Sequence, residues 1–277
     1  MKQVYGLIGY PVKHSLSPLM HNAAFEALKI DAEYKLFPLK EEELGDFLKN
    51  ASKNNICGLN ITVPYKEKVI PSLDSLSQEA KLIGAVNTIK VNNKLEGFNT
   101  DGEGFIRHLK DLGFLAADKT IAVIGAGGAS RAICVYLAKE SPKRISIYDI
   151  DKLRATGLIK HLQDNFSDIV FNRVDSVTDL NIQESDLLVN ASSNGMNDSD
   201  SLLLDSKEIN SKILVYDLIY NPSQTKLLAM AKVRGARVAN GLGMLLYQGV
   251  AAFELWTGQG APVEIMRKAL NEGVENL

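Results

Sequence analysis

The chain has 277 residues, of which 45% are hydrophobic and 23% are charged, and this length predicts two domains with sizeable cores. Its formal net charge of −2 argues against nucleic acid as the main partner, because a phosphate-binding surface carries a basic excess. Small molecules are therefore the expected ligands.

The first hundred residues alternate between strand and helix patterns. We expect strands at residues 4–8, 33–39 and 57–63, one helix beginning at Pro18 and another over residues 41–49. Residues 73–82 have a short helical pattern, and Asn92-Asn93 centres a hairpin between two further strands. This order predicts an α/β domain.

Two serines precede the first predicted helix. Ser15 and Ser17 stand just before Pro18, which fits the first turn of a helix. Ser17 would serve as the helix cap, as serine often does. Alternatively, both hydroxyls, with the helix amides behind them, would hold an anionic group such as a carboxylate. The pattern leaves both interpretations open.

Polar side chains also end the third predicted strand. Asn60, Thr62 and Lys66 are separated by even numbers of residues, so they project to one side of an extended chain. A single lysine is usually a solvated surface group. An amide and a hydroxyl inside an apolar strand nevertheless need partners, and a ligand would supply them.

A third polar group stands before the next amphipathic helix, which ends at Gly113. It consists of Asn99, Thr100 and Asp101, followed by Gly102. Thr100 or Asp101 would act as the N-cap of this helix, and such a role does not exclude chemistry.

The second part of the chain, from about Gly102 to Ala239, repeats strand and helix. The strands are expected at residues 120–124, 144–149, 169–174, 187–190, 213–217 and 237–239. Apolar strands that alternate with helices predict a doubly wound parallel sheet. The connection 175–186 has no clear pattern, and the polar segment 192–201 is expected as a loop near a cofactor crevice. Two helices follow, one from Gly241 to Trp256 and one starting at Pro262.

The most informative pattern of this second part is a glycine turn. The strand 120–124 leads directly into Gly125, Ala126, Gly127, Gly128 and Ala129, after which a helix begins. Missing side chains let backbone N–H groups approach a pyrophosphate at the positive end of that helix. Asp149 follows about 24 residues after Gly125, where a carboxylate would hold ribose hydroxyls. A dinucleotide cofactor is therefore expected.

Several other classes of protein are excluded by composition. Cys57 and Cys134 lie far apart beside apolar residues, so we expect two buried thiols and no disulfide framework. The four histidines lack a metal-binding spacing, and we expect no metal. No apolar run is long enough to span a bilayer, and the first residues lack the apolar centre of a signal peptide. A cytoplasmic enzyme without a membrane or nucleic-acid partner fits these limits.

In sequence, the chain resembles the shikimate dehydrogenase family over nearly its full length. The resemblance rests on separated blocks: Gly9-Tyr10-Pro11 with Ser15-Leu16-Ser17-Pro18, Gly58-Leu59-Asn60-Ile61-Thr62-Val63-Pro64-Tyr65-Lys66, Gly84-Ala85-Val86-Asn87-Thr88, Asn99-Thr100-Asp101-Gly102, Gly125-Ala126-Gly127-Gly128-Ala129, Tyr216-Asp217-Leu218-Ile219-Tyr220, and Gly241-Leu242-Gly243-Met244-Leu245 with Gln248 and Trp256-Thr257-Gly258. Chance agreement over so many blocks is implausible.

This resemblance implies the fold and the reaction. The fold would be an N-terminal α/β substrate domain, residues 1–101, with residues 242–277 packing back on it, and a Rossmann-like doubly wound nucleotide domain, residues 102–241. The substrate would lie in a cleft between the two domains. The enzyme would interconvert 3-dehydroshikimate and shikimate by NAD(P)-dependent hydride transfer. The resemblance leaves open whether the protein forms a homodimer.

The resemblance also implies roles for individual residues. Lys66 and Asp101 would be the catalytic pair, and Ser15 and Ser17 would bind the substrate carboxylate. The ring hydroxyls or the carboxylate would be contacted by Asn60, Thr62, Asn87, Tyr220 and Gln248, while Gly125, Ala126, Gly127, Gly128, Ala129, Asp149, Leu218, Gly241 and Met244 would bind the cofactor. The chemistry supports a lysine, because hydride transfer to a ketone places charge on oxygen, where a cation or proton donor is needed.

One departure from the family pattern concerns the cofactor. Members that use NADP end the second strand of the nucleotide domain in an Asn-Arg-Thr/Ser motif, whereas this chain has Asp149, Ile150 and Asp151. A carboxylate accepts bonds from both ribose hydroxyls but repels a 2′-phosphate, so NAD is the expected cofactor. The alternative is NADP, with Lys152 or Arg154 supplying the missing positive charge.

NAD use leaves two alternative functions open. Some NAD-using relatives oxidise quinate, which has an additional hydroxyl on the carbon that bears the carboxylate. Ser17 favours shikimate, since some quinate-preferring relatives have threonine there. A non-catalytic nucleotide sensor would keep the glycine turn but would not need Lys66 and Asp101.

Overall fold

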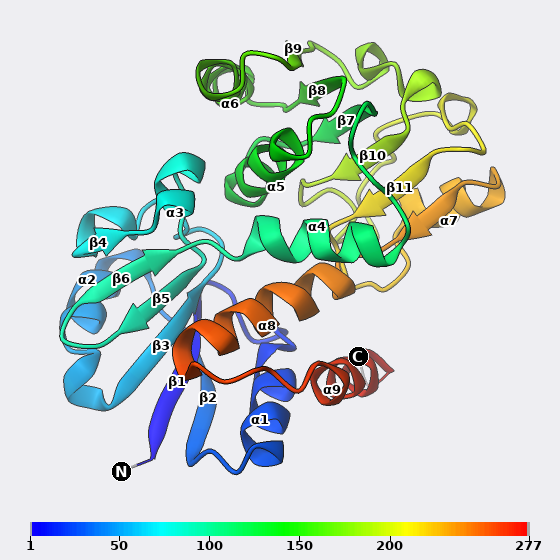
Figure 1. The fold of residues 1–277 in the computed structure, drawn as a ribbon. Helices are drawn as coiled ribbons and strands as arrows, with labels where there is room; N and C mark the ends of the chain where they lie inside the picture. Colours follow the sequence, from blue (N-terminus) through cyan, green and yellow to red (C-terminus); the bar gives the residue numbers. More distant parts are fainter. Residues whose placement is uncertain (1, 276–277) are drawn as a thin grey trace. The chain divides into compact units, whose positions relative to one another are not determined.

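The structure, a computed structural model, describes residues 2–275 and divides the chain into two compact units. The first unit comprises Met1–Gly104 and Leu245–Leu277, and the second comprises Phe105–Met244. The sequence predicted junctions after residues 101 and 241, and the assignment of substrate and nucleotide to the two domains stays a prediction. Each unit contains one largely parallel sheet with helices, which confirms the α/β class (Figure 1).

The first unit contains a mixed six-stranded sheet of order β2-β1-β3-β5-β6-β4. Its strands are β1 (Gln3–Gly9), β2 (Ala32–Pro38), β3 (Ile56–Ile61), β4 (Ser75–Leu76), β5 (Thr88–Val91) and β6 (Leu95–Phe98). Its helices are α1 (Ser17–Ala27), α2 (Glu41–Lys49), α3 (Gln78–Ile83) and α9 (Val263–Glu275), with most of α8 (Leu242–Thr257) and the start of α4 (Asp101–Asp111). The strands β1, β2 and β3 are parallel, and β5 is antiparallel to both β3 and β6.

The helix predicted over residues 73–82 is wrong in its first half. Residues 75 and 76 form β4, which pairs with β6, and α3 begins only at Gln78. Ser77 caps α3, because its hydroxyl accepts the N–H of Ala80 at 3.0 Å. The serine cap therefore interrupts the apolar spacing that looked continuous in sequence.

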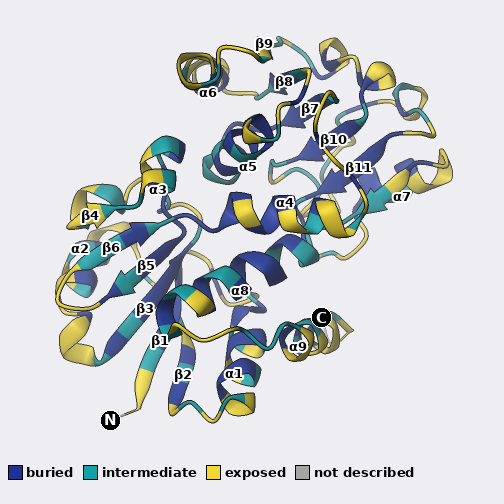
Figure 2. Cartoon of the chain, viewed as in Figure 1, coloured by how far each residue is buried: buried dark blue, intermediate teal, exposed yellow. Residues whose placement is uncertain are grey.

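The C-terminal helices belong to the first unit. Trp256 in α8 donates its Nε1–H to the carbonyl of Ile89 in β5 at 3.0 Å, and α9 packs against α1. Buried and exposed positions alternate along these helices as amphipathic patterns require (Figure 2). Of the two cysteines, Cys134 is buried as expected, whereas Cys57 is only half-buried.

The second unit contains a six-stranded, entirely parallel sheet of order β12-β11-β10-β7-β8-β9. Its strands are β7 (Thr120–Ile124), β8 (Arg144–Tyr148), β9 (Val170–Arg173), β10 (Leu187–Asn190), β11 (Leu214–Asp217) and β12 (Arg237–Ala239), and its helices are α5 (Gly128–Lys139), α6 (Lys152–Asn165) and α7 (Lys226–Val233). The strand order reverses between β7 and β10. In open parallel sheets, ligands bind outside the carboxyl ends of the strands at this point.

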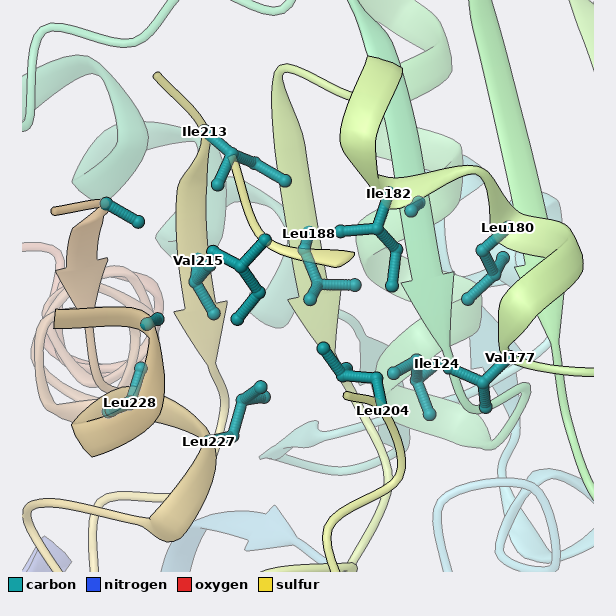
Figure 3. Packing of buried hydrophobic residues seen from close by; sticks show 14 residues of the cluster. Ile124, Val177, Leu180, Ile182, Leu188, Leu204, Ile213, Val215, Leu227 and Leu228 are labelled. Carbon is teal, nitrogen blue, oxygen red and sulfur yellow. The ribbon is translucent and has the colours of Figure 1, made fainter. Parts of the chain in front are cut away.

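Both faces of this sheet are covered. The helices α5 and α6 pack on each other, and α6 also packs against β8 and β9. On the other face, Leu227 and Leu228 of α7 join a core cluster with Leu188 and Val215 of the sheet (Figure 3). The connection 175–186, which had no clear sequence pattern, forms two short 3-10 helices that add Leu180 and Ile182 to this cluster (Figure 3). No helix within residues 2–275 has the length and apolarity needed to cross a membrane.

A fully buried histidine lies in the aromatic core of the first unit. The ring of His21 stacks on that of Tyr34 at 4.5 Å between centroids and lies 5.5 Å from that of Trp256. Neither ring nitrogen has a hydrogen-bond partner in the described part of the chain. Burial therefore lowers the pKa of His21 from 6.5 to about 3.

We predict that this histidine makes the protein less stable in mild acid. The unfolded chain binds a proton at His21 below pH 6.5, whereas the folded chain does so only near its pKa of about 3, so stability falls as pH falls through this window. Between pH 7 and pH 5 the free energy of unfolding should decrease by about 2 kcal/mol through this group alone. Urea titrations over this pH range measure the decrease.

The matched comparison uses His21→Phe, with His14→Gln as the control at an exposed histidine. The phenylalanine variant should lose about 2 kcal/mol of pH dependence, because its ring cannot bind a proton. The control should retain the dependence of the wild type. Identical pH dependence in all three proteins would contradict the prediction.

Candidate functional site

A half-buried lysine and a buried aspartate form an ion pair in the first unit. Lys66 Nζ lies 2.5 Å from Asp101 Oδ2, and the two side chains are only 15% and 6% exposed. Lys66 follows β3, and its carbonyl accepts the N–H of Val86 at 2.7 Å. Asp101 is the first residue of α4, and its backbone N–H donates to Asn99 Oδ1 at 3.0 Å.

This pair contradicts the surface interpretation of Lys66, and it gives the Asp101 carboxylate side-chain partners in place of a role as helix cap. A solvated lysine would be largely exposed, which Lys66 is not. Both carboxylate oxygens of Asp101 bind side chains, Oδ2 to Lys66 and Oδ1 to the amide of Asn87 at 2.8 Å. A buried cation and carboxylate in contact are a candidate for proton transfer to a bound oxygen.

Asn87 connects this pair to other polar groups. Its side-chain nitrogen Nδ2 also donates to Thr100 Oγ1 at 3.0 Å and contacts Gln248 Oε1 at 3.5 Å. Its side-chain oxygen Oδ1 accepts the backbone N–H of Thr100 at 2.8 Å. Gln248, in α8, is buried and anchored by its own amide to the carbonyl of Leu245. The structure thus brings together Lys66, Asn87, Asp101 and Gln248 from four separate parts of the sequence.

Asn60 lies one step deeper in the same polar network. Its side-chain oxygen accepts the hydroxyl of Tyr34 at 2.7 Å. Its side-chain nitrogen donates to the backbone carbonyl of Asn87 at 3.2 Å and to Thr88 Oγ1 at 3.1 Å. Both amide protons are therefore used inside the protein, and these bonds fix the backbone of Asn87. Direct contact of Asn60 with a substrate stays a prediction.

The two serines lie at the start of α1, in an arrangement that differs from the predicted cap. Ser17 is the first residue of α1 and is buried, and its N–H donates to Ser15 Oγ at 3.2 Å. The interpretation of Ser17 as the cap is therefore wrong, because Ser17 is already the first helical residue and Leu16 occupies the N-cap position. Ser17 lies near the phenol of Tyr34, which donates its hydroxyl to Asn60 Oδ1. Burial raises the pKa of Tyr34, so its phenol stays protonated and serves as a donor.

Two more predicted substrate residues lie outside these hydrogen bonds. Thr62 is half-buried just after β3 and is anchored by its backbone N–H to the carbonyl of Ile8 at 2.9 Å. Tyr220 lies in the second unit, after β11. Roles of Ser15, Thr62 and Tyr220 in substrate binding stay predictions.

In the second unit, the glycine turn has the backbone geometry of a phosphate-binding loop. Gly125 has a φ of +106°, and a side chain there would lie 2.8 Å from the backbone of Ala191. Gly127 is the N-cap of α5, and a Cβ on Gly127 would meet nothing within 4 Å. Residues 127–129 are half-buried at the start of α5, and backbone amides at a helix start attract an anion.

Asp149 holds this turn in place. Its Oδ2 accepts the N–H of Ala126 at 2.6 Å, and its Oδ1 accepts the N–H of Asp151 at 2.8 Å. The N–H of Gly125 donates to the carbonyl of Tyr148 at 2.7 Å, which ties the turn to the end of β8. The carboxylate is therefore adjacent to the glycine turn, although half of its capacity to accept hydrogen bonds is already used.

The remaining predicted cofactor residues meet at the end of β11. A Cβ on Gly241 would lie 1.9 Å from the Leu218 carbonyl oxygen, so only glycine allows this approach. Met244 is buried, and its backbone lies near the phenol of Tyr216. The phenol oxygen of Tyr216 lies 2.6 Å from His108 Nδ1. The N–H of Leu218 donates to the carbonyl of Asn190 at 2.9 Å.

A buried carboxylate fixes the strand end from which Leu218 projects. Asp217 accepts bonds from Asn190 Nδ2 at 3.0 Å, Thr225 Oγ1 at 2.7 Å and the N–H of Ile219 at 3.1 Å. Burial raises the pKa of Asp217, and the three donors oppose this rise.

Sequence reasoning missed the supporting residues Tyr34, Thr88, Asn190 and Asp217. Tyr34 lies on the inward side of the predicted strand 33–39, and its alternation with charged neighbours was the available signal. Asp217, an acid at the end of an apolar strand, offered a similar signal. Their partners are 8 to 27 positions away in sequence and could not be identified from it.

Comparison with known proteins gives matches over nearly the whole chain. Residues 7–89 match the model described as "Shikimate dehydrogenase substrate binding domain", and residues 241–270 match "Shikimate 5'-dehydrogenase C-terminal domain". A curated shikimate dehydrogenase (NADP(+)) of Methanopyrus kandleri is 43% identical over 277 residues, covering 97% of this chain and 95% of its own.

Solved structures agree with this result. Shikimate 5-dehydrogenase from Listeria monocytogenes, in complex with shikimate and NAD, is 35% identical with a TM-score of 0.89, covering 97% of this chain and 96% of its own. Quinate dehydrogenase from Corynebacterium glutamicum, in complex with NAD, is 30% identical with a TM-score of 0.89, covering 98% and 99%. These matches confirm the predicted fold class and the predicted oxidoreductase function. The chain belongs to the shikimate dehydrogenase family.

Proposed function

We propose that the protein transfers hydride reversibly between shikimate and NAD, forming 3-dehydroshikimate and NADH, with Lys66 and Asp101 as its catalytic pair. The observation that carries this proposal is the contact of 2.5 Å between Lys66 Nζ and Asp101 Oδ2 in a place where both side chains are largely withdrawn from solvent. Ion pairs on a protein surface are surrounded by water, whereas this pair is hydrogen-bonded to buried Asn87, which in turn binds buried Thr100.

The proton steps belong to Lys66 and Asp101. A bound nicotinamide supplies the hydride for reduction and accepts it in oxidation. When the ketone carbon gains hydride, its oxygen gains negative charge and takes a proton from the Lys66 ammonium. In the reverse direction, neutral Lys66 takes the hydroxyl proton as the carbon loses hydride. Asp101 holds the lysine in place and stabilises its positive charge.

Polar residues around the pair would orient the substrate. Ser15 and Ser17, at the start of α1, suit a carboxylate because the helix amides stand behind them. Thr62, Asn87, Gln248 and Tyr220 would contact the ring hydroxyls. A hydroxyl that binds such buried partners is recognised strongly, since an analogue without it leaves them unpaired.

NAD is the proposed cofactor because of the charges after β8. Asp149 has two remaining acceptor sites for ribose hydroxyls, and Ile150, 91% exposed, provides no positive charge for a 2′-phosphate. Curated relatives that are 38% to 43% identical are named as NADP(+) enzymes, and NADP is therefore the alternative, with Lys152 or Arg154 as its cations.

Quinate is the alternative substrate, supported by the similarity to a quinate dehydrogenase that binds NAD. Ser17 favours shikimate, since some quinate-preferring relatives have threonine at this position. A non-catalytic NAD sensor is the least favoured function, because it would leave the Lys66 and Asp101 pair without a purpose. A cytoplasmic location and a homodimer stay predictions.

We predict that Lys66→Ala lowers kcat for shikimate oxidation by roughly a hundredfold to ten-thousandfold, the usual range for a general acid or base. NADH binding, followed by cofactor fluorescence, should be unchanged. The control is Lys68→Ala, which removes an exposed lysine that is paired with Glu41. Near-normal turnover of Lys66→Ala would overturn the catalytic role, and a loss of turnover in both variants would point to damage of the fold.

We predict a higher kcat/KM with NAD than with NADP, and with shikimate than with quinate. A spectrophotometric assay of the four combinations measures both preferences. Asp149→Asn should lower kcat/KM for NAD by roughly tenfold, because hydrogen bonds to a charged acceptor are stronger than those to an amide. A clear preference of the wild type for NADP would refute the cofactor assignment, and no turnover in any combination would favour the sensor.

A further inference from the structure

Two cations and one carboxylate form a cluster beside the end of β8. Asp175 binds Arg173 in a bidentate manner, at 2.9 Å from Oδ1 to Nη1 and 3.2 Å from Oδ2 to Nη2. The same Oδ1 lies 2.8 Å from Lys152 Nζ. Asp175 therefore binds a cation from β9 and a cation from the first turn of α6 at the same time.

The strand register places this cluster next to Asp149. In the parallel pair of β8 and β9, Ile147 is opposite Arg173, and the N–H of Val174 donates to the Ile147 carbonyl at 3.1 Å. Asp149 and Asp175 each follow these paired residues by two positions, so both lie just beyond the carboxyl ends of adjacent strands. Because neighbouring strands lie about 4.8 Å apart, a group bound at Asp149 would be within reach of Asp175 and its two cations.

The first amides of α6 are occupied as well. Asp151 is the N-cap of α6, and its Oδ1 accepts the N–H groups of Leu153 at 3.0 Å and Arg154 at 3.1 Å. An exposed helix start would attract a phosphate, but here an internal carboxylate already uses these donors.

The charges of this region cancel. The three carboxylates Asp149, Asp151 and Asp175 are balanced by Lys152, Arg154 and Arg173. A phosphate carries about −1.5 to −2 at neutral pH, so it needs a surplus of positive charge that this region does not offer.

We propose that Asp175 determines cofactor specificity, by binding Lys152 and Arg173 and so withholding both from the 2′-phosphate of NADP. This inference rests on the proposed preference for NAD and extends it from Asp149 to a residue on the neighbouring strand. Asp175 is a specificity-determining residue without contact to the reacting atoms.

The Asp175 carboxylate binds its two cations over the whole neutral pH range, because it stays ionised there. Arg173 and Lys152 lower the pKa of Asp175 from 3.8 to about 2, so the carboxylate stays ionised through the neutral range. Removing the carboxylate changes the local charge by one unit and releases the two cations. The side chains of Lys152 and Arg173 are 66% and 30% exposed, so both can turn toward a ligand.

The test compares Asp175→Asn with Asp164→Asn. Asp164 forms an exposed ion pair with Lys160 on the same helix, α6, about 18 Å along the helix axis from Lys152. Both variants therefore lose one negative charge, together with one ion pair at Asp164 and two at Asp175. In Asp175→Asn, KM for NADP and the dissociation constant of NADP measured by calorimetry should fall about three- to tenfold. The values for NAD should change less than twofold, and Asp164→Asn should behave as the wild type.

A second variant tests the mechanism. Lys152→Gln with Arg173→Gln, added to Asp175→Asn, should abolish the gain for NADP, and 0.5 M salt should reduce it. If Asp175→Asn and Asp164→Asn give equal NADP affinities, the inference is wrong even where the wild type prefers NAD. If the wild type prefers NADP, the proposed cofactor is wrong. The role of Asp175 is still judged by its own comparison, and equal NADP affinities of Asp175→Asn and Asp164→Asn would overturn it.

Discussion

The candidate site of the first unit depends on the ion pair between the Asp101 carboxylate and Lys66. Withdrawing a lysine and an aspartate from water is costly, and their attraction compensates only when the remaining donors and acceptors are also satisfied. Asn87 meets this condition at Oδ1, and Thr100 in turn fixes both ends of the Asn87 amide. The ends of β3, β5 and α4 are thus held together by polar contacts where the apolar core ends.

The same principle organises the second unit. Asp149 binds the N–H of Ala126 and so fixes the glycine turn, and Asp217 binds the N–H of Ile219 and fixes the end of β11. In both cases a carboxylate at a strand end satisfies backbone groups that the turn leaves unpaired. Because each carboxylate holds backbone, the positions of Gly125 and Leu218 are set before any ligand binds.

Much of the fold and of the site could be predicted from the sequence, because the signals are local. The parallel strands, the glycine turn and the polar residues after β3 each depend on a few neighbouring residues. The short strand β4 was missed, because its two residues depend on pairing with residues of β6 that lie 21 positions further along the chain. The bond of Tyr34 to Asn60 was missed for the same reason, since only the folded sheet brings these strands together.

Cofactor choice illustrates how a local signal and a nonlocal one combine. Asp149 alone is an incomplete argument for NAD, because a nearby lysine or arginine can offset one carboxylate and both Lys152 and Arg154 follow it closely. In our proposal, the choice between NAD and NADP depends on whether these cations are already bound to carboxylates of the protein. Lys152 is paired with Asp175, a residue that sequence reasoning did not connect with the cofactor, and Asp151 occupies the amides of α6. A carboxylate therefore lies beside each of these cations, and the proposed selectivity against a 2′-phosphate would arise from the sum of their charges.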